Sequence, residues 1–117
     1  MRRLLPDRRA SWTQKLVVGG RHIYVTFGEY DDGTLGEVFL TVDRWGTAMR
    51  SLLDAFAVSF SLGIQHGVPL ATAVNALRGI DFLPSGKVEG AEDFGVREAP
   101  SMLAAVAAVI EAAYLKE

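Results

Sequence analysis

The chain has 117 residues, half of them hydrophobic, with 12 Lys and Arg, 14 Asp and Glu, and no cysteine. This length fits one domain, and the apolar content is sufficient for a packed core. The absence of cysteine excludes disulfides, thiolate metal sites and thiol-based catalysis within the chain.

The charge is unevenly distributed. Residues 1–9 contain four arginines against Asp7, whereas the rest of the chain is net acidic. We therefore divide the chain into a basic N-terminal arm or linker (residues 1–12) and one α+β domain (residues 13–117). The arm is interpreted as a solvated linker or as a contact for nucleic acid phosphates or an acidic protein surface. The candidate anion or nucleic-acid contacts are Arg2, Arg3, Arg8, Arg9, Lys15, Arg21 and Lys87.

No segment indicates secretion or membrane insertion. Pro6 and three charged residues follow the first five residues, where a secretory signal would need an apolar run. The longest apolar stretch, residues 102–110, is far shorter than the roughly 20 residues of a membrane-spanning helix. We expect a cytoplasmic protein without membrane contact.

Residues 13–42 predict a three-stranded antiparallel meander. Strands are expected over residues 13–18, 22–27 and 37–42, because apolar and polar side chains alternate in the second and third segments and the first is rich in β-formers. Gly19 and Gly20 suit a two-residue hairpin turn, and Gly33 suits the next reversal. Aromatic residues fall on both faces of these strands, which predicts at least partial cover on both sides of the sheet.

A long helix is expected to run to about His66, with Thr47 or Asp43 as its N-cap and Gly67 as its stop. Its polar residues fall on one narrow stripe, and Phe56 and Phe60 are expected core residues. A helix that is apolar around most of its circumference is usually central. We therefore expect the sheet on one side of it and another helix or subunit elsewhere.

The remaining elements are a short helix over residues 70–77, a long connection over 80–95 without clear periodicity, and a last helix over 101–116. Pro69 and Pro100 fit the first turns of the two helices. The last helix is apolar on all sides at its centre, so it is expected to be buried or paired with another copy. The fold class is α+β: a meander packed against a long central helix, a short helix and a C-terminal helix.

No catalytic, metal or cofactor site is assigned from the residues. His22 and His66 lack ligand spacing, and the acidic turn of Glu29, Asp31 and Asp32 lacks the calcium-loop pattern. Ser85 and Lys87 could bind an anion in a turn, but the phosphate-loop frame is incomplete. Neither histidine adjoins a nucleophile motif.

The order of several sequence runs resembles the C-terminal domain of adenosylcobalamin-dependent (class II) ribonucleotide reductases, the TSCPD domain. The runs include residues 6–9 (PDRR), 12–15 (WTQK), 18–20 (VGG), 26–30 (TFGEY), 32–39 (DGTLGEVF), 50–53 (RSLL), 61–70 (SLGIQHGVPL) and 82–90 (FLPSGKVEG). The resemblance fades in the last helix, and the Thr-Ser-Cys-Pro-Asp string of the family is absent.

The resemblance implies a role in deoxyribonucleotide metabolism. The residues that ribonucleotide reduction requires limit what that role can be. Such a reductase needs a thiyl-forming cysteine, a reducing cysteine pair and a cobalamin-binding barrel, and this chain has no cysteine and is too short for the barrel. We expect a non-catalytic accessory or assembly domain without a cofactor. It would act by self-association, with a homodimer favoured, or by contact with a ribonucleotide reductase catalytic chain. The alternative is a nucleotide or nucleic-acid binding module that uses the basic arm.

Overall fold

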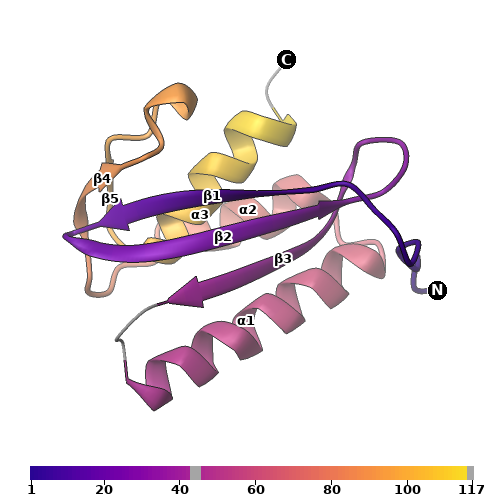
Figure 1. Cartoon of the computed structure of the whole chain (residues 1–117), viewed down its shortest axis with the longest axis horizontal. Helices are drawn as coiled ribbons and strands as arrows, with labels where there is room; N and C mark the ends of the chain where they lie inside the picture. Colours follow the sequence, from indigo (N-terminus) through magenta and orange to yellow (C-terminus); the bar gives the residue numbers. More distant parts are fainter. Residues whose placement is uncertain (43–45, 116–117) are drawn as a thin grey trace.

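The computed structural model of the chain describes residues 1–42 and 46–115. Within these ranges the chain forms a five-stranded antiparallel sheet and three helices, which confirms the α+β class and the N-terminal meander (Figure 1). The sheet has the order β3-β2-β1-β4-β5. Its strands are β1 (Ser11–Val18), β2 (Arg21–Glu29), β3 (Leu35–Val42), β4 (Gly86–Glu89) and β5 (Glu98–Ala99); the helices are α1 (Thr47–Gln65), α2 (Leu70–Arg78) and α3 (Met102–Ile110).

The β1–β2 hairpin has the predicted glycine turn. Gly19 and Gly20 have φ values of 56° and 83°, as a two-residue turn of the primed type requires, and Val18 pairs with Arg21 across it. A Cβ at Gly19 would also lie 2.4 Å from the carbonyl oxygen of Ser85. Glycine is therefore needed here both for its backbone conformation and for the close approach of the later chain.

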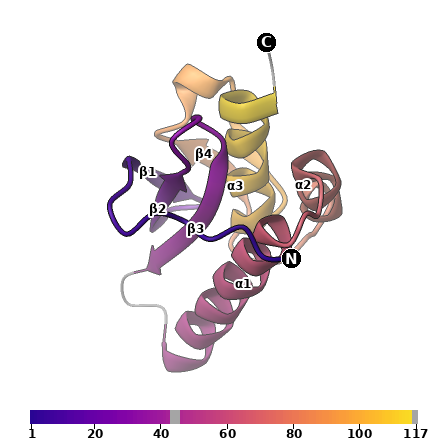
Figure 2. The same cartoon turned by 90° about the vertical axis from the view of Figure 1, so that its right-hand side faces the viewer.

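The helices cover only one face of the sheet (Figure 2). Side chains of the inner face, such as Leu16, Val25 and Phe27, are fully buried. On the outer face Tyr24 is 38% exposed and Phe39 is 51% exposed. Within the described part of the chain, helices therefore cover the inner face alone, and the expected partial cover of the outer face leaves both of its aromatics partly exposed.

Helix α1 begins and ends close to the predicted positions. Its N-cap is Gly46, without a side-chain cap, and Thr47 is the first helical residue rather than the cap. Asp43, the other predicted cap, lies outside the described residues. At the other end Gly67 has φ 101°, and the Val68 N–H donates to the Gly63 carbonyl at 3.0 Å, which is the bond of a glycine-terminated helix.

The segment over residues 80–95, predicted as a long connection without clear periodicity, contains β4 and a 3₁₀ turn over Glu92–Phe94. Strand β4 pairs with β1 at Val17 and Val18 and with β5, so it extends the sheet beyond the meander. It has four residues and β5 has two. Strands this short carry too little alternation to be recognised, and they are stabilised by pairing with the existing sheet.

Helix α3 is buried within its own chain. Met102, Ala105, Val106 and Val109 have no exposed surface, since the helix lies between the sheet and α2 (Figures 1 and 2). The Ser101 hydroxyl caps it by accepting from the Ala104 N–H at 3.0 Å. After Ile110 the chain continues as a π-helical turn over Glu111–Leu115, whereas the sequence predicted one helix to Lys116, which lies outside the described residues.

None of the helices in the described part of the chain has both the length and the hydropathy to cross a bilayer.

Candidate functional site

The N-terminal arm packs on the domain instead of extending into solvent. The Arg3 N–H donates to the Gln65 carbonyl at 2.7 Å, and the Arg2 Nε donates to the Gln65 side-chain oxygen at 2.7 Å. Gln65 is buried, and its amide nitrogen also donates to the Gly36 carbonyl at 2.9 Å. One glutamine at the end of α1 therefore holds both the arm and the start of β3.

Most of the arm's charge is used in contacts with the domain. The Arg3 guanidinium lies 3.7 Å from the centre of the Tyr30 ring and bonds to Asp32 at 3.0 Å. Arg9 pairs with Glu37 at 2.6 Å, and both side chains are largely buried. Arg8 is exposed. The arm therefore presents less free positive charge than its sequence indicates.

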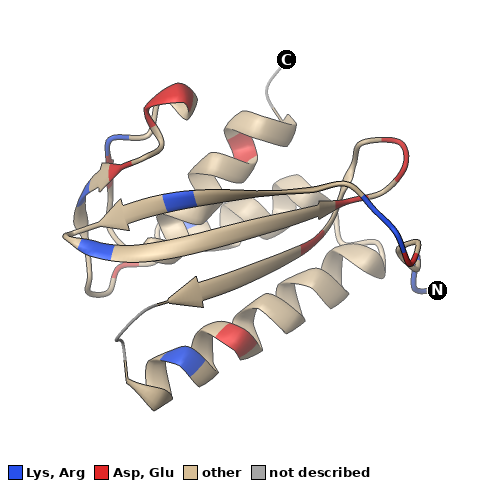
Figure 3. Cartoon of the chain, in the orientation of Figure 1, with Lys and Arg blue, Asp and Glu red and all other residues tan. Residues whose placement is uncertain are grey.

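The other candidate basic residues lie away from the arm. Lys15 is exposed on β1, and Arg21 begins β2 at the β1–β2 hairpin. Lys87 adjoins the same hairpin, because the Gly19 N–H donates to its carbonyl at 2.9 Å, and its ammonium lies 3.7 Å from Glu89. The arm contacts the β2–β3 turn, at the opposite end of β2. The structure therefore does not unite the seven residues in one patch (Figure 3).

The weaker candidate sites gain no support. Asp32 of the acidic turn bonds to Arg3 and to the Thr34 hydroxyl and N–H. The hollow beside Ser85 is also lined by the carboxylates of Asp81 and Glu98, which would repel an anion. Across residues 1–42 and 46–115, no three His, Asp or Glu side chains are grouped in a way that could hold a metal ion.

A cluster of polar groups joins the last turn of the chain to the sheet. Trp12 Nε1 donates to the Tyr114 hydroxyl at 2.8 Å, and that hydroxyl donates to Glu29 at 2.5 Å. Burial, with the Glu29 carboxylate, raises the pKa of Tyr114 above its usual range. The phenol therefore keeps its proton and remains a donor. The Tyr114 ring lies 6.4 Å from the Trp12 ring and 6.2 Å from the Phe27 ring, between ring centres, so the cluster holds the C-terminal turn against the sheet.

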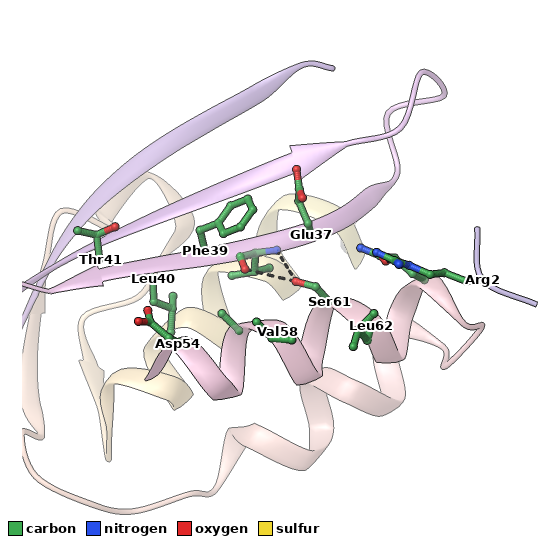
Figure 4. A pocket seen from close by; sticks show the side chains of 12 residues that line it. Arg2, Glu37, Phe39, Leu40, Thr41, Asp54, Val58, Ser61 and Leu62 are labelled. Carbon is green, nitrogen blue, oxygen red and sulfur yellow. Dashed lines mark hydrogen bonds between the residues drawn. The ribbon is translucent and has the colours of Figure 1, made fainter. Parts of the chain in front are cut away.

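A groove of about 440 Å³ lies between β3 and α1 (Figure 4). Its walls are mainly apolar and include Phe39, Val58 and Leu62, with Asp54 at one end and Arg2 at the other. The Ser61 hydroxyl bridges the two elements, since it accepts from the Val38 N–H at 2.9 Å and lies 3.3 Å from the Val38 carbonyl. Ser61 thereby satisfies backbone groups on the free edge of β3.

The apolar surface continues from the groove onto the outer side of α1. Leu52 is 66% exposed, Val58 59% and Leu62 39%, beside the exposed ring of Phe39. Within the described chain, the sheet and α2 therefore cover only part of α1, and a subunit on its remaining side stays a prediction. Contiguous exposed apolar residues of this kind are typical of contact surfaces. The alternation over 37–42 and the apolar circumference of α1 were the sequence signals for this surface.

The family comparison covers nearly the whole chain. The TSCPD domain family matches residues 2–114. The chain belongs to the TSCPD domain family. Its match begins at Arg2, so the basic arm is part of the region that the family describes. The proposed boundary after residue 12 stays a prediction.

Relatives of this TSCPD domain are named vitamin B12-dependent ribonucleotide reductases. The one from Bradyrhizobium diazoefficiens is 49% identical over 89 residues, covering 76% of this chain and 7% of the relative. The one from Agrobacterium fabrum is 40% identical over 114 residues, covering 97% of this chain and 9% of the relative. The TSCPD domain thus spans less than a tenth of the length of these two proteins. No solved structure matches it significantly.

Proposed function

We propose that this TSCPD domain is a non-catalytic accessory module that acts through protein contact, either by self-association or by binding a reductase-type catalytic chain. The proposal is supported by the continuous apolar surface formed by the groove and the outer side of α1. The chain carries no cysteine, so it holds none of the thiols that ribonucleotide reduction needs. Contact is the activity that its surface serves best.

The groove has features that suit a protein contact. Its apolar walls would release water when covered, and each end carries one charge of opposite sign, Asp54 and Arg2. An apolar centre with a polar rim is the usual composition of protein interfaces. The bridging Ser61 and Gln65 contacts keep the two walls in place before a partner binds.

Two measurements test the proposal. Light scattering over a range of concentrations detects self-association. A capture experiment detects binding to the catalytic chain of a B12-dependent reductase from which the TSCPD region has been removed. Val58→Asp places a charge in the apolar surface, and Thr72→Asp places one on the exposed side of α2 as a control. We expect association of the wild type and of Thr72→Asp, and loss with Val58→Asp. A monomer at every concentration that also fails to capture the catalytic chain would contradict the proposal.

The alternative, a nucleic-acid module using the basic arm, is less well supported. Arg2, Arg3 and Arg9 already contact Gln65, Asp32 and Glu37. Phosphate binding by these side chains would have to displace internal partners. The electrophoretic mobility of single-stranded DNA at low salt tests this alternative. Binding that weakens in Arg8→Ala, and also weakens as salt is raised, would favour it. Absence of binding would contradict it.

A further inference from the structure

The water-facing side of α1 has an unusual composition. Its exposed residues include an uncharged group that falls within an arc of about 120° at 100° per residue: Ala48, Ser51, Leu52, Ala55, Val58, Ser59 and Leu62. The charged residues of the helix lie off this arc, and Asp54 lines the groove beside β3. A 19-residue helix therefore presents an uncharged, largely apolar strip to solvent.

The sizes of these side chains are arranged symmetrically about the middle of the helix. When two antiparallel copies of α1 are centred on Ala55, a residue faces the residue of the other copy that lies on the same side of the contact line and at the same distance beyond the centre to within one position. The facing pairs are Ala48 with Leu62, Ser51 with Val58, Leu52 with Ser59, and Ala55 with Ala55 of the second copy. Each large side chain meets a small one, and the smallest pair lies at the centre. Such a pattern allows close packing of two helices without collisions.

We propose that the outer side of α1 binds a second copy of this chain, with the two α1 helices antiparallel and the two-fold axis at Ala55. This inference rests on the proposed function and selects self-association among the contacts it allows. An isologous interface requires a surface that is complementary to itself, and the size pattern of α1 meets that requirement. The arc has no charges, so no like charges would face each other across its centre.

The position of α1 in the fold permits this contact. The helix forms the outer margin of the molecule in both views, and no other described element lies beyond its outer side (Figures 1 and 2). The exposed Phe39 at the groove lies beside the strip, and Val58 and Leu62 belong to both the strip and the groove. Two copies could therefore approach along α1 without rearrangement of the sheet, and the flanking groove would add apolar area to the helix contact.

The proposed axis makes a geometric prediction at one residue. Packed helix axes lie about 8–10 Å apart and Cα atoms lie about 2.3 Å from each axis, so the two Ala55 Cα atoms would lie roughly 3.5–5.5 Å apart. This range overlaps the Cα separation of disulfides, about 4.4–6.8 Å. Two copies of Ala48, in contrast, would be separated along the pair by roughly 20 Å, from the helical rise of about 1.5 Å per residue.

Single-cysteine cross-linking tests the register, because the chain has no cysteine of its own. The variants are Ala55→Cys, Ala48→Cys, Leu62→Cys, and Asn75→Cys on the exposed side of α2 as a control. Each is checked for native circular dichroism, oxidised with diamide and separated without reductant. We expect at least fivefold more covalent dimer for Ala55→Cys than for Asn75→Cys, and little for Ala48→Cys alone. An equimolar mixture of Ala48→Cys and Leu62→Cys should cross-link well above either variant alone.

The inference fails if Ala55→Cys cross-links no better than Asn75→Cys, or if Ala48→Cys alone cross-links as well as Ala55→Cys. Should light scattering then still show a dimer, or the reductase chain still be captured, the proposed function would stand with a different interface. Should neither form of association occur, both proposals would fail. Ser51→Cys mixed with Val58→Cys is a second pair that decides the register if Ala55→Cys does not fold.

Discussion

Helices α1 and α3 are both strongly apolar, yet they occupy very different environments. Helix α3 is buried on nearly every side, with Val106 and Val109 fully inaccessible. Helix α1 contacts the sheet along one side, and Leu52 and Val58 remain more than half exposed. The difference follows from their positions in the fold, because α3 lies between the sheet and α2, whereas α1 lies along the edge strand β3.

The comparison shows that apolar composition has two uses in this chain. In α3 it stabilises the monomer, since alanines allow the sheet and α2 to approach closely. In α1 the outer apolar residues add nothing to the core, and their exposure costs solubility without a gain in folding. A surface of this kind is consistent with the contact function that we propose.

The largest expected effect distinguishes the two helices directly. Val106→Asp places an unpaired carboxylate in the core, which costs several kcal/mol and should unfold a domain with the usual stability of about 5–15 kcal/mol. Leu52→Asp on the outer side of α1 should change the free energy of unfolding by less than about 1 kcal/mol. Urea unfolding followed by circular dichroism measures both. Equal destabilisation by the two variants would contradict the assignment of the two environments.

A smaller effect is expected along the inner side of α1. Phe60 is buried, whereas Phe56 is only partly buried, and their ring centres lie 5.7 Å apart. Phe60→Ala should cost about 3–5 kcal/mol, and Phe56→Ala should cost less. Thermal unfolding of the two variants makes the comparison. A change near zero for Phe60→Ala would mean that α1 does not pack on the sheet as described.

Within the described residues, the Ser61 hydroxyl is one of two side-chain hydrogen-bond links between α1 and β3, the other being Gln65. Ser61→Ala leaves the Val38 N–H and carbonyl without this partner, so we expect a loss of about 1–3 kcal/mol. Ser59→Ala, on the outer side of the same helix, is the matched control and should be nearly neutral. Hydrogen exchange at the Val38 amide should also accelerate in Ser61→Ala. Unchanged exchange would show that the bridge does not protect the edge strand.

The smallest effect is expected at Asp32, which lies in the β2–β3 turn and pairs with Arg3 of the arm. Hydrogen bonds from the Thr34 hydroxyl and N–H, followed by the Arg3 contact, lower the pKa of Asp32 to about 2. Because the folded pKa lies below the unfolded value near 3.8, the contribution of Asp32 to stability is present above about pH 4 and is lost as pH falls toward 2. The Tm difference between wild type and Asp32→Asn should therefore shrink over this range. A constant difference would contradict the ionic contact.

Parts of this structure could be predicted because their causes are local. Gly19 and Gly20 specify a turn through their backbone freedom, and the alternation over 37–42 places Phe39 opposite Leu40. Gly67 ends α1 for the same local reason. Strands β4 and β5 could not be predicted, because they are held by pairing with residues distant in the chain.

The candidate site likewise has features that could be predicted from the sequence and features that could not. The sequence located the basic residues but could not show that Arg3 lies over Tyr30 or that Arg9 pairs with Glu37, since these contacts join segments that meet only after folding. It identified the apolar circumference of α1 but could not tell whether a second layer covered it. The sequence predicts that the apolar last helix is either buried or paired with another copy, and the structure buries it within the chain and leaves the outer side of α1 exposed.

By itself the sequence determined the class of fold, the meander and the approximate helix positions. It also determined the resemblance to the reductase domain and the absence of thiol chemistry. All of these follow from residue types and local periodicity. Only the tertiary structure decided which apolar helix is internal and which is free to bind. The physical reason is that burial depends on what packs against a face. Two helices with similar patterns therefore differ only once the order of strands places one over the sheet and the other at its edge.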